Sequence, residues 1–458
     1  MSYFGVIPPE IQSEILSYLS YSDLKNCAFV ARSWSPQASR LLWHSLRFDV
    51  VIASHEEVAP ASEKFARFIS TLAAHPQHAP HIHRLALTID GYLYDETSLS
   101  ILENSTTSLT VPWDSIGNAL HPILQLEYLE LHGRLLFPEI VLFASQALSS
   151  APVRALYTFS PIATLPQLCT TWSSHITDLL VGDISMTDCA ELPLLPHLRF
   201  IASNNISVVL RLVPHSPIES ICVFDISCEE SEFSALGSLI RARATAGIST
   251  LRSVYFGQPD SEPALLNFIG SLNCPTLEHI HLVMDGTDWD LPFNMADFAA
   301  IWLKTGPVPS LSETLPALTS IRFEFHDEGL DTISSGPLSS EDQASSHLQS
   351  EAGLRLSTWL MQGDYPSMLR HVEVYSMGAA GHYSTYRTVN IEAKRRSSES
   401  GELVQGFNAW DITDLLEEVK LEPETSVHAV GLVHPLLRGN DRATLPVVPD
   451  ADGVIRCD

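Results

Sequence analysis

The sequence lacks long apolar runs, paired cysteines and a basic leader. No apolar run reaches the roughly 20 residues that a membrane-spanning helix needs, so we expect no membrane partner. A basic segment followed by an apolar one is missing at the N-terminus, so no secretory signal is expected. The cysteines are scattered without C-x-x-C spacing, which argues against a zinc ribbon or a disulfide framework. Such usage is typical of a reducing compartment, and we expect a cytoplasmic or nuclear location.

Positive charge is also scarce. The chain has 26 Lys and Arg against 54 Asp and Glu, a formal net charge of −28. Nucleic acid would be repelled by this charge, so it is not expected as a partner. Hydrophobic residues make up 45% of the 458 residues and charged residues 17%, which is typical of a folded protein of several domains.

Motifs of catalysis are missing too. The chain has no G-x-x-x-x-G-K-[ST], G-x-G-x-x-G, H-E-x-x-H or G-x-S-x-G. No cysteine is framed as a ubiquitin-transferring nucleophile. We therefore expect a protein that is not an enzyme and that has no catalytic residues and no cofactor.

One cluster of metal-ligand type is present, in "HPQHAPHIHR": His75, His78, His81 and His83. A metal site is one reading. Prolines at 76 and 80 deny this segment the helix that would align the imidazoles. We interpret the cluster as a turn that enters a strand, and expect no metal.

What the sequence does contain begins with "IPPEIQSEILSYLSYSDL", residues 7–24. Pro8 and Pro9 suit a helix start, and an apolar stripe of helical period follows, formed by Ile11, Ile15, Leu16 and Leu19. Ser22 is a good N-cap for a second helix with Asp23 in its first turn, and Pro36 starts a third. The alternation of Leu46, Phe48 and Val50 predicts a strand. Three short helices cannot bury this much apolar surface among themselves, so part of it must dock elsewhere.

This segment resembles the F-box, whose pattern runs roughly Leu-Pro-x-Glu-Ile-Leu, then Asp-Leu, Val-Cys-Arg-x-Trp and Leu-Trp. The resemblance covers residues 5–48 and depends on Ile7, Pro8, Glu10, Ile11, Ile15, Leu19, Asp23, Leu24, Val30, Arg32, Trp34, Leu42 and Trp43. Ile7, Gln12 and Ala31 depart from the family pattern, and Gln12 replaces an apolar residue.

The resemblance implies that the hairpin docks on the small adaptor subunit of an SCF-type cullin-RING ubiquitin ligase. Large, rigidly placed apolar residues are the expected anchors on the adaptor: Pro8, Ile11, Ile15, Leu19, Leu24, Val30 and Trp34. Some of them must form the hairpin's own core, and the sequence does not separate the two sets.

The rest of the chain repeats a pattern of aliphatic, two residues, aliphatic, one residue, aliphatic. Its instances start at Ile82, Leu126, Val153, Ile176, Leu198, Ile218, Leu251, Leu277, Leu318 and Leu369. Most starts closely follow a proline, which suits the beginning of a strand. Helical segments lie between several strands, at 136–149, 262–272 and 292–304. This body resembles the degenerate leucine-rich repeats found behind fungal F-boxes.

The expected fold is therefore an all-α three-helix F-box followed by an α/β leucine-rich-repeat-like solenoid with irregular repeats. An irregular α/β domain is the alternative. In a solenoid, the residue between the second and third aliphatic positions points to the concave face, where a substrate would bind. These residues are Glu130, Tyr157, Leu180, Cys222, Tyr255, His281, Arg322 and Glu373. They include no basic cluster, which disfavours recognition of a phosphorylated motif.

The expected domains are an F-box at 1–48, a linker helix within 49–81, repeats at 82–385 and an acidic, partly disordered tail at 386–458. Within the repeats, the Ser- and acid-rich stretch 334–351 is expected to be a mobile insertion. Within the tail, an acidic helix is expected near 409–420.

These features predict a substrate-recognition subunit of an SCF-type ligase. Its partners are the adaptor, through it a cullin, and an unidentified protein substrate. A scaffold that uses the hairpin without degrading anything is the second hypothesis. An unrecognised hydrolase is the least favoured one.

Overall fold

The computed structural model describes residues 7–30, 34–52, 55–91, 113–132, 138–158, 165–182, 186–223, 230–257, 268, 272–285, 311–327, 368–369, 371–378, 384–390 and 416–421. These residues fall into two compact units, which meet in the sequence after Leu198. We call them the first and the second unit. Among the described residues, no helix has the length and hydropathy needed to cross a bilayer.

The first unit begins with three short helices, α1 (Pro9–Ser17), α2 (Tyr21–Val30) and α3 (Ser35–Leu42). Pro9 occupies the first turn of α1, where its missing N–H is not needed. The prediction of Ser22 as the N-cap of α2 is wrong. Ser20 has this role, because its Oγ accepts the Asp23 N–H at 3.2 Å and donates to the Asp23 carboxylate at 2.7 Å. A serine followed three residues later by an acid is the stronger capping pattern.

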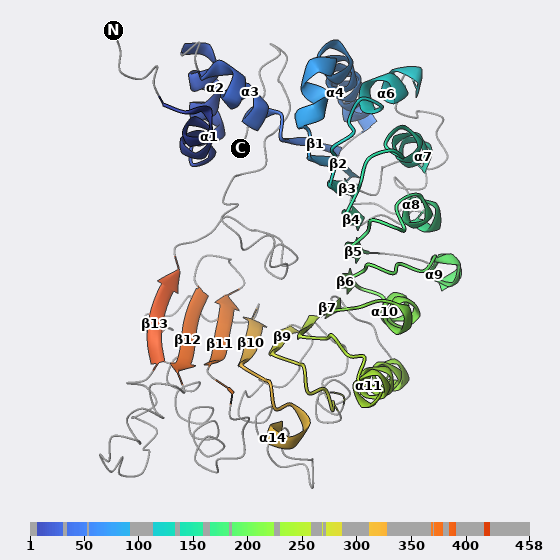
Figure 1. The fold of residues 1–458 in the computed structure, drawn as a ribbon, viewed down its shortest axis with the longest axis vertical. Coiled ribbons are helices and arrows are strands. Elements are labelled where there is room, and N and C mark those ends of the chain that lie inside the picture. The colour runs from blue at the N-terminus through green and yellow to red at the C-terminus, as the bar shows by residue number, and fades with distance from the viewer. Residues whose placement is uncertain are drawn as a thin grey trace. The chain divides into compact units, whose positions relative to one another are not determined.

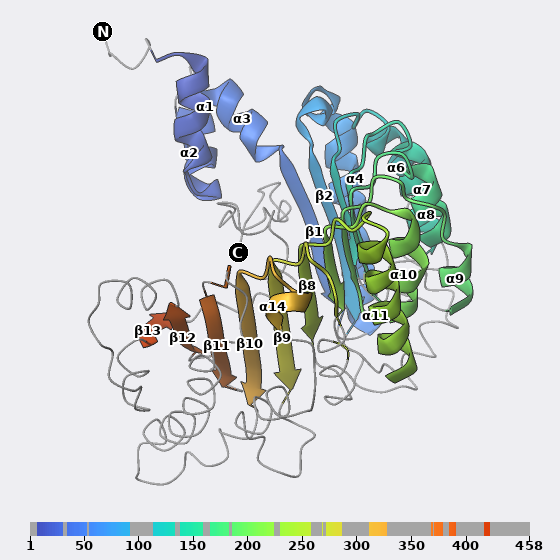
Figure 2. The same ribbon diagram turned by 60° about the horizontal axis from the view of Figure 1, so that its bottom comes forward.

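A parallel sheet follows in the first unit. Its strands are β1 (Ser45–Ile52), β2 (Arg84–Gly91), β3 (Tyr128–His132), β4 (Ala155–Thr158) and β5 (Asp178–Val181). Each of these strands pairs in parallel with the next one in the sequence. The connections contain α4 (His55–Ala74), the 3-10 helix η2 (Pro76–His81), α6 (Trp113–Leu120), α7 (Pro138–Ala147), α8 (Leu165–Thr171) and α9 (Met186–Glu191). Figures 1 and 2 show that these α-helices cover one face of the sheet.

The second unit repeats this plan. Strands β6 (Phe200–Ser203), β7 (Ser220–Val223), β8 (Ser253–Gly257), β9 (His279–Asp285), β10 (Ser320–Asp327) and β11 (His371–Gly378) pair in parallel in sequence order. The antiparallel strands β12 (Ser384–Asn390) and β13 (Leu416–Leu421) complete the sheet. Its described helices are α10 (Ile206–Leu212), η3 (Val213–His215), α11 (Glu230–Thr245) and α14 (Leu311–Thr314).

The ten instances of the aliphatic pattern mark strands β2–β11. None of the ten residues that start it is more than 4% exposed. The strands also begin alike: the Glu127 carbonyl accepts the N–H groups of Arg154 and Ala155 at 2.8 and 2.9 Å, and the Glu278 carbonyl accepts those of Thr319 and Ser320 at 2.8 and 3.1 Å. The same hydrogen bonds at successive strands show that the sequence pattern corresponds to a recurring structural unit.

The structure differs from the sequence predictions in two segments, the linker at 49–81 and the helix near 409–420. The helix predicted in the linker is α4, and its Phe65, Phe68, Ile69 and Leu72, which recur at i, i+3, i+4 and i+7, are buried. The segment 49–81 also contains the end of β1, which pairs with β2, and the 3-10 helix η2.

The prediction of an acidic helix near 409–420 is wrong for the described residues 416–421, because these residues form strand β13. The six residues of β13 are too short a segment for a helical period to be read with certainty. Their pairing with β12 supplies the backbone hydrogen bonds that a helix would otherwise make. The insertion 334–351 and the helix at 292–304 lie outside the described residues, as does 262–272 apart from Phe268 and Leu272.

Candidate interaction surfaces

The three N-terminal helices have a small core of their own. Leu16 and Ala38 are fully buried and Leu24 is 9% exposed, with Leu19 and Trp34 packed against them. Of the seven predicted anchors, Leu19, Leu24 and Trp34 therefore belong largely to this core. Pro8, Ile11 and Ile15 lie on the surface, and the side chain of Val30 is outside the described part.

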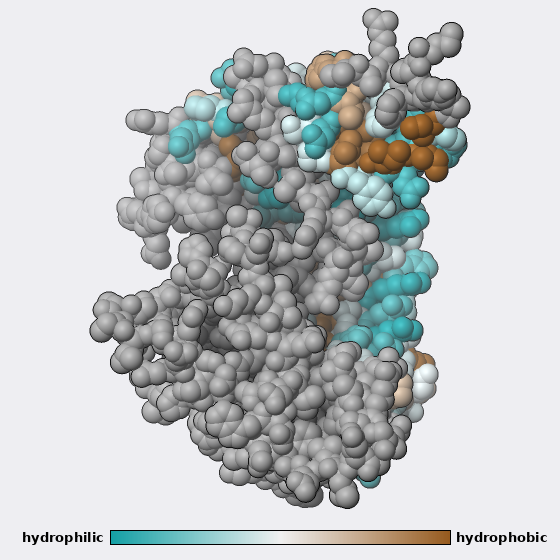
Figure 3. All heavy atoms as spheres, turned by 90° about the vertical axis from the view of Figure 1, so that its left-hand side faces the viewer, coloured by the Kyte–Doolittle hydropathy of each residue, from teal (hydrophilic) through white to brown (hydrophobic). Residues whose placement is uncertain are grey.

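A row of exposed apolar side chains runs along α1. Ile11 is 47% exposed, Ile15 39% and Tyr18, just after the helix, 77%. Their spacing of four and three residues places them on one face of the helix. Phe29 on α2 is 79% exposed. Figure 3 faces the side on which α1–α3 lie in Figure 1, and brown, hydrophobic side chains gather at its top, at the height of these helices.

Tyr18 and Phe29 are not among the anchors predicted from the sequence. Tyr18 continues the spacing that begins at Ile11, and this signal was available in the sequence. Phe29 has no comparable signal, because only the packing of α2 on α3 shows which of its apolar residues remain outside.

Gln12, one of the three departures from the family pattern, lies inside the domain. It is 6% exposed, and its Nε2 donates to the Ile7 carbonyl at 2.8 Å. The amide therefore satisfies a backbone group at the start of α1 and leaves the exposed row of Ile11, Ile15 and Tyr18 unchanged.

The histidine-rich segment forms η2 and leads into β2, which agrees with its interpretation as an entry to a strand. No group of three or more His, Cys, Asp or Glu side chains that could hold a metal ion occurs among the described residues.

On the sheet face of the first unit that the helices do not cover, three predicted substrate-binding residues share one row. Glu130 pairs in register with Tyr157, and Tyr157 with Leu180. Only Glu130 has appreciable exposed surface, because Tyr157 is 5% exposed and Leu180 is fully buried.

Tyr128, two positions before Glu130, is partly exposed like Glu130, and Asp178, two positions before Leu180, is more accessible than that leucine. The Tyr128 hydroxyl donates to Glu130 Oε2 at 2.7 Å, its ring meets the Tyr157 ring edge-on at 4.9 Å, and Arg84 lies 5.8 Å from its centroid. Burial and then the Glu130 carboxylate raise the pKa of Tyr128, and burial and then Asp178 raise that of Tyr157. Both phenols are therefore neutral hydrogen-bonding groups at physiological pH.

The other five predicted substrate-binding residues share a row in the second unit. The register links Cys222 to Tyr255, Tyr255 to His281, His281 to Arg322 and Arg322 to Glu373. The side chains of Arg322 and Glu373 are outside the described part. Cys222 and Tyr255 are buried and His281 is half-buried. Burial raises the pKa of the Cys222 thiol well above its ordinary value, so this cysteine is not a reactive thiolate.

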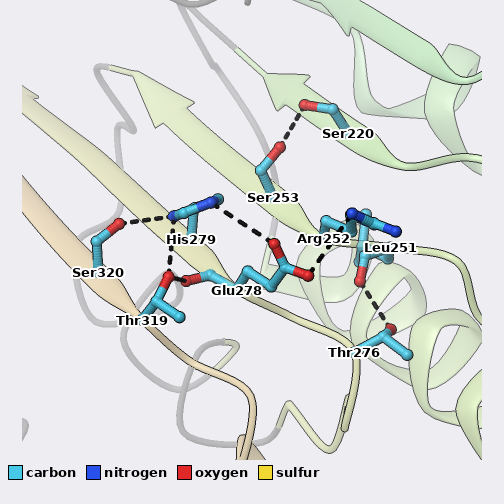
Figure 4. Close-up of polar contacts among 9 residues, drawn as sticks. All are labelled: Ser220, Leu251, Arg252, Ser253, Thr276, Glu278, His279, Thr319 and Ser320. Carbon is cyan, nitrogen blue, oxygen red and sulfur yellow. Dashed lines mark hydrogen bonds and ion pairs between the residues drawn. The ribbon is translucent and has the colours of Figure 1, made fainter. Parts of the chain in front are cut away.

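In the second unit, too, the accessible side chains lie two positions earlier, and they are hydroxyls and an imidazole. Figure 4 shows the Ser253 hydroxyl donating to that of Ser220 at 2.6 Å, and His279 Nδ1 within 2.7 Å of Ser320 Oγ. Just before the strands begin, the Arg252 guanidinium lies 3.8 Å from the Glu278 carboxylate, and the Arg199 guanidinium lies 3.8 Å from the Glu219 carboxylate. The sequence pattern missed this row because it predicted the direction of a side chain but not its depth.

Comparison with protein families agrees with the geometry of the first helices. The family model described as F-box-like matches residues 4–49, which contain α1–α3 and the beginning of β1. No curated protein matches the chain. The chain thus has an F-box-like domain at its N-terminus, followed by parallel strands that alternate with helices.

Proposed function

We propose that this chain is the substrate-recognition subunit of an SCF-type cullin-RING ubiquitin ligase. Its F-box-like domain binds the adaptor and through it a cullin, and the following body binds a protein substrate. The contribution of such a subunit to catalysis is positional, because holding the substrate near the charged enzyme raises its effective concentration. The chain itself then needs no catalytic residue.

The observation that carries the proposal is the exposed apolar row of a domain whose core is already filled. Leu16, Leu24 and Ala38 complete the interior, yet Ile11, Ile15 and Tyr18 remain in water. Exposed apolar side chains that gather on one surface are typical of a protein interface. Their location inside the matched residues 4–49 favours the adaptor as the partner.

For the body we propose a leucine-rich-repeat-like solenoid with irregular repeats, of the kind found behind fungal F-boxes. The recurring double hydrogen bonds at successive strands and the helices on one face support it. The substrate then binds the sheet face without helices, over the predicted rows that contain Glu130 and His281. The row two residues earlier adds Tyr128, Asp178, Ser253 and His279.

The test is binding of the purified full-length chain to the purified adaptor by calorimetry. Ile15→Asp places a charge in the proposed interface and is expected to weaken binding at least tenfold, about 1.4 kcal/mol or more. Ile248→Asp is the matched control, because Ile248 is also an exposed isoleucine, 55% accessible, but lies in the second unit. Equal affinity for both variants would contradict the assignment of the surface.

The scaffold hypothesis separates from the ligase hypothesis at the next step. A receptor brings the cullin into the complex with the adaptor, and its substrate becomes ubiquitinated in a reconstituted reaction. Binding of the adaptor without the cullin would favour the scaffold.

A further inference from the structure

Basic and imidazole side chains gather where the three helices end and the sheet begins. The group consists of Arg40 on α3, His44 before β1, and His75, His78, His81 and His83 in and beside η2. We call it the histidine junction. It is exceptional in a chain that has 54 acidic residues against 26 Lys and Arg.

Ring contacts hold the histidine junction together. The Trp43 ring, at the end of α3, stacks on His78 with centroids 4.8 Å apart and planes 11° apart. His75 meets the same tryptophan at 5.9 Å, and His44 lies 4.7 Å from His83. The first backbone hydrogen bonds between β1 and β2 lie beside these rings, because the His44 carbonyl accepts the N–H groups of His83 and Arg84 at 2.9 and 3.1 Å.

The charges around the central imidazoles all have one sign. His75 and His81 act on His78, and Arg40 and His83 act on His81. Helix α4 also packs on η2, but none of its described charges is among those that shift these two groups. No carboxylate is among the groups that shift the pKa of His78 or His81.

Protonation of His78 or His81 therefore opposes the fold. Burial first, and then the neighbouring positive groups, lower the pKa of His78 and of His81 below the ordinary 6.5. The neutral forms are favoured in the folded state, so their stabilisation is complete above about pH 6.5 and decreases as the pH falls through the folded-state pKa.

We propose that the histidine junction is a pH-sensitive coupling, in which acidification loosens the contact between α3 and η2 and frees the three helices from the first strands. The exposed row on α1 and Phe29 lie outside the junction. If the proposed function holds, acid then lowers ubiquitin transfer to a bound substrate more than it lowers adaptor binding. The loosening itself does not depend on that function.

The test is amide hydrogen exchange of the full-length chain at pH 7.5 and 5.5, corrected for the intrinsic pH dependence of exchange. The amides of His83 and Arg84 are expected to exchange at least fivefold faster at pH 5.5. The amides of Arg154 and Ala155 are the internal reference, because they make the same double contact with the Glu127 carbonyl farther along the sheet. Equal acceleration at both places, or none at His83 and Arg84, would overturn the proposal.

Two variants link the effect to the junction. His78→Phe keeps a ring against Trp43 but cannot be protonated, and it should abolish the acceleration, whereas His121→Gln on the exposed turn after α6 should retain it. If His78→Phe does not fold, Arg40→Gln removes the permanent charge next to His81 and should reduce the acceleration about twofold. Full acceleration in the folded junction variant contradicts the proposal. Adaptor binding at pH 7.5 is measured separately, so a failure of the proposed function remains distinguishable.

Discussion

The three N-terminal helices and the sheets that follow bury apolar side chains to very different extents. In the helices, Ile11, Ile15, Tyr18 and Phe29 remain 39–79% exposed. In the sheets, none of the ten residues that start the aliphatic pattern is more than 4% exposed. A unit of three short helices has too little interior for its own apolar residues, whereas in each unit the strands and the helices on one face of the sheet enclose a larger interior. An exposed apolar residue does not by itself indicate an interface, because Leu124, Phe143, Leu194, Ile248 and Met368 are also 38–55% exposed in the rest of the chain. In the helices, the indication is that Ile11, Ile15 and Tyr18 gather on one face of α1.

The largest loss of stability is expected when a buried side chain of the sheet is shortened. Leu129→Ala removes a fully buried side chain in β3, and it should lower the free energy of unfolding by about 2–5 kcal/mol. Ile11→Ala should change it by less than about 0.5 kcal/mol, because Ile11 lies half in water. Urea denaturation followed by circular dichroism measures both, and similar losses would show that the two regions do not differ as described.

A smaller loss of stability is expected in the second unit when an arginine that binds three backbone carbonyls is replaced. The Arg243 guanidinium on α11 donates to the carbonyls of Val213, Pro214 and Ser216 at 2.8, 3.0 and 2.9 Å, and so closes the end of η3. Arg243→Gln should destabilise the fold by about 1–3 kcal/mol, since these acceptors lose a charged donor. Arg241→Gln on the same helix, where the residue is exposed, is the control for the loss of charge. The two melting curves should differ clearly, and coincident curves would exclude this role.

The smallest loss of stability is expected in the three N-terminal helices, when the N-cap of α2 is removed. Ser20→Ala removes the cap of α2 and should cost about 1 kcal/mol of local stability. Ser22→Ala, at the position that the sequence favoured, should cost less than half as much. The amide exchange of α2 measures this difference, and the reverse order would restore Ser22 as the cap.

Much of the fold followed from local patterns. The proline-started helix α1, the alternation in β1 and the periodicity of α4 all have short-range causes, and each was confirmed. The aliphatic pattern located strands β2–β11, and the residue between its second and third aliphatic positions located one row of side chains in each unit. The predictions failed where a short segment satisfied two patterns, as at Ser20 and Ser22, or where a distant partner decided the outcome, as at β13.

The sequence by itself determined which residues are apolar, at which period they recur and therefore which face of each element they occupy. Tertiary structure alone decided which of those faces are covered. Leu24 and Ile11 are equally plausible anchors in the sequence, but packing with Leu16 and Ala38 buries the first and leaves the second in water. Tyr157 and Tyr128 lie on one face of the sheet, yet their depth differs because the neighbouring strands supply the contacts. Periodicity is a property of the chain, whereas burial depends on what packs against it.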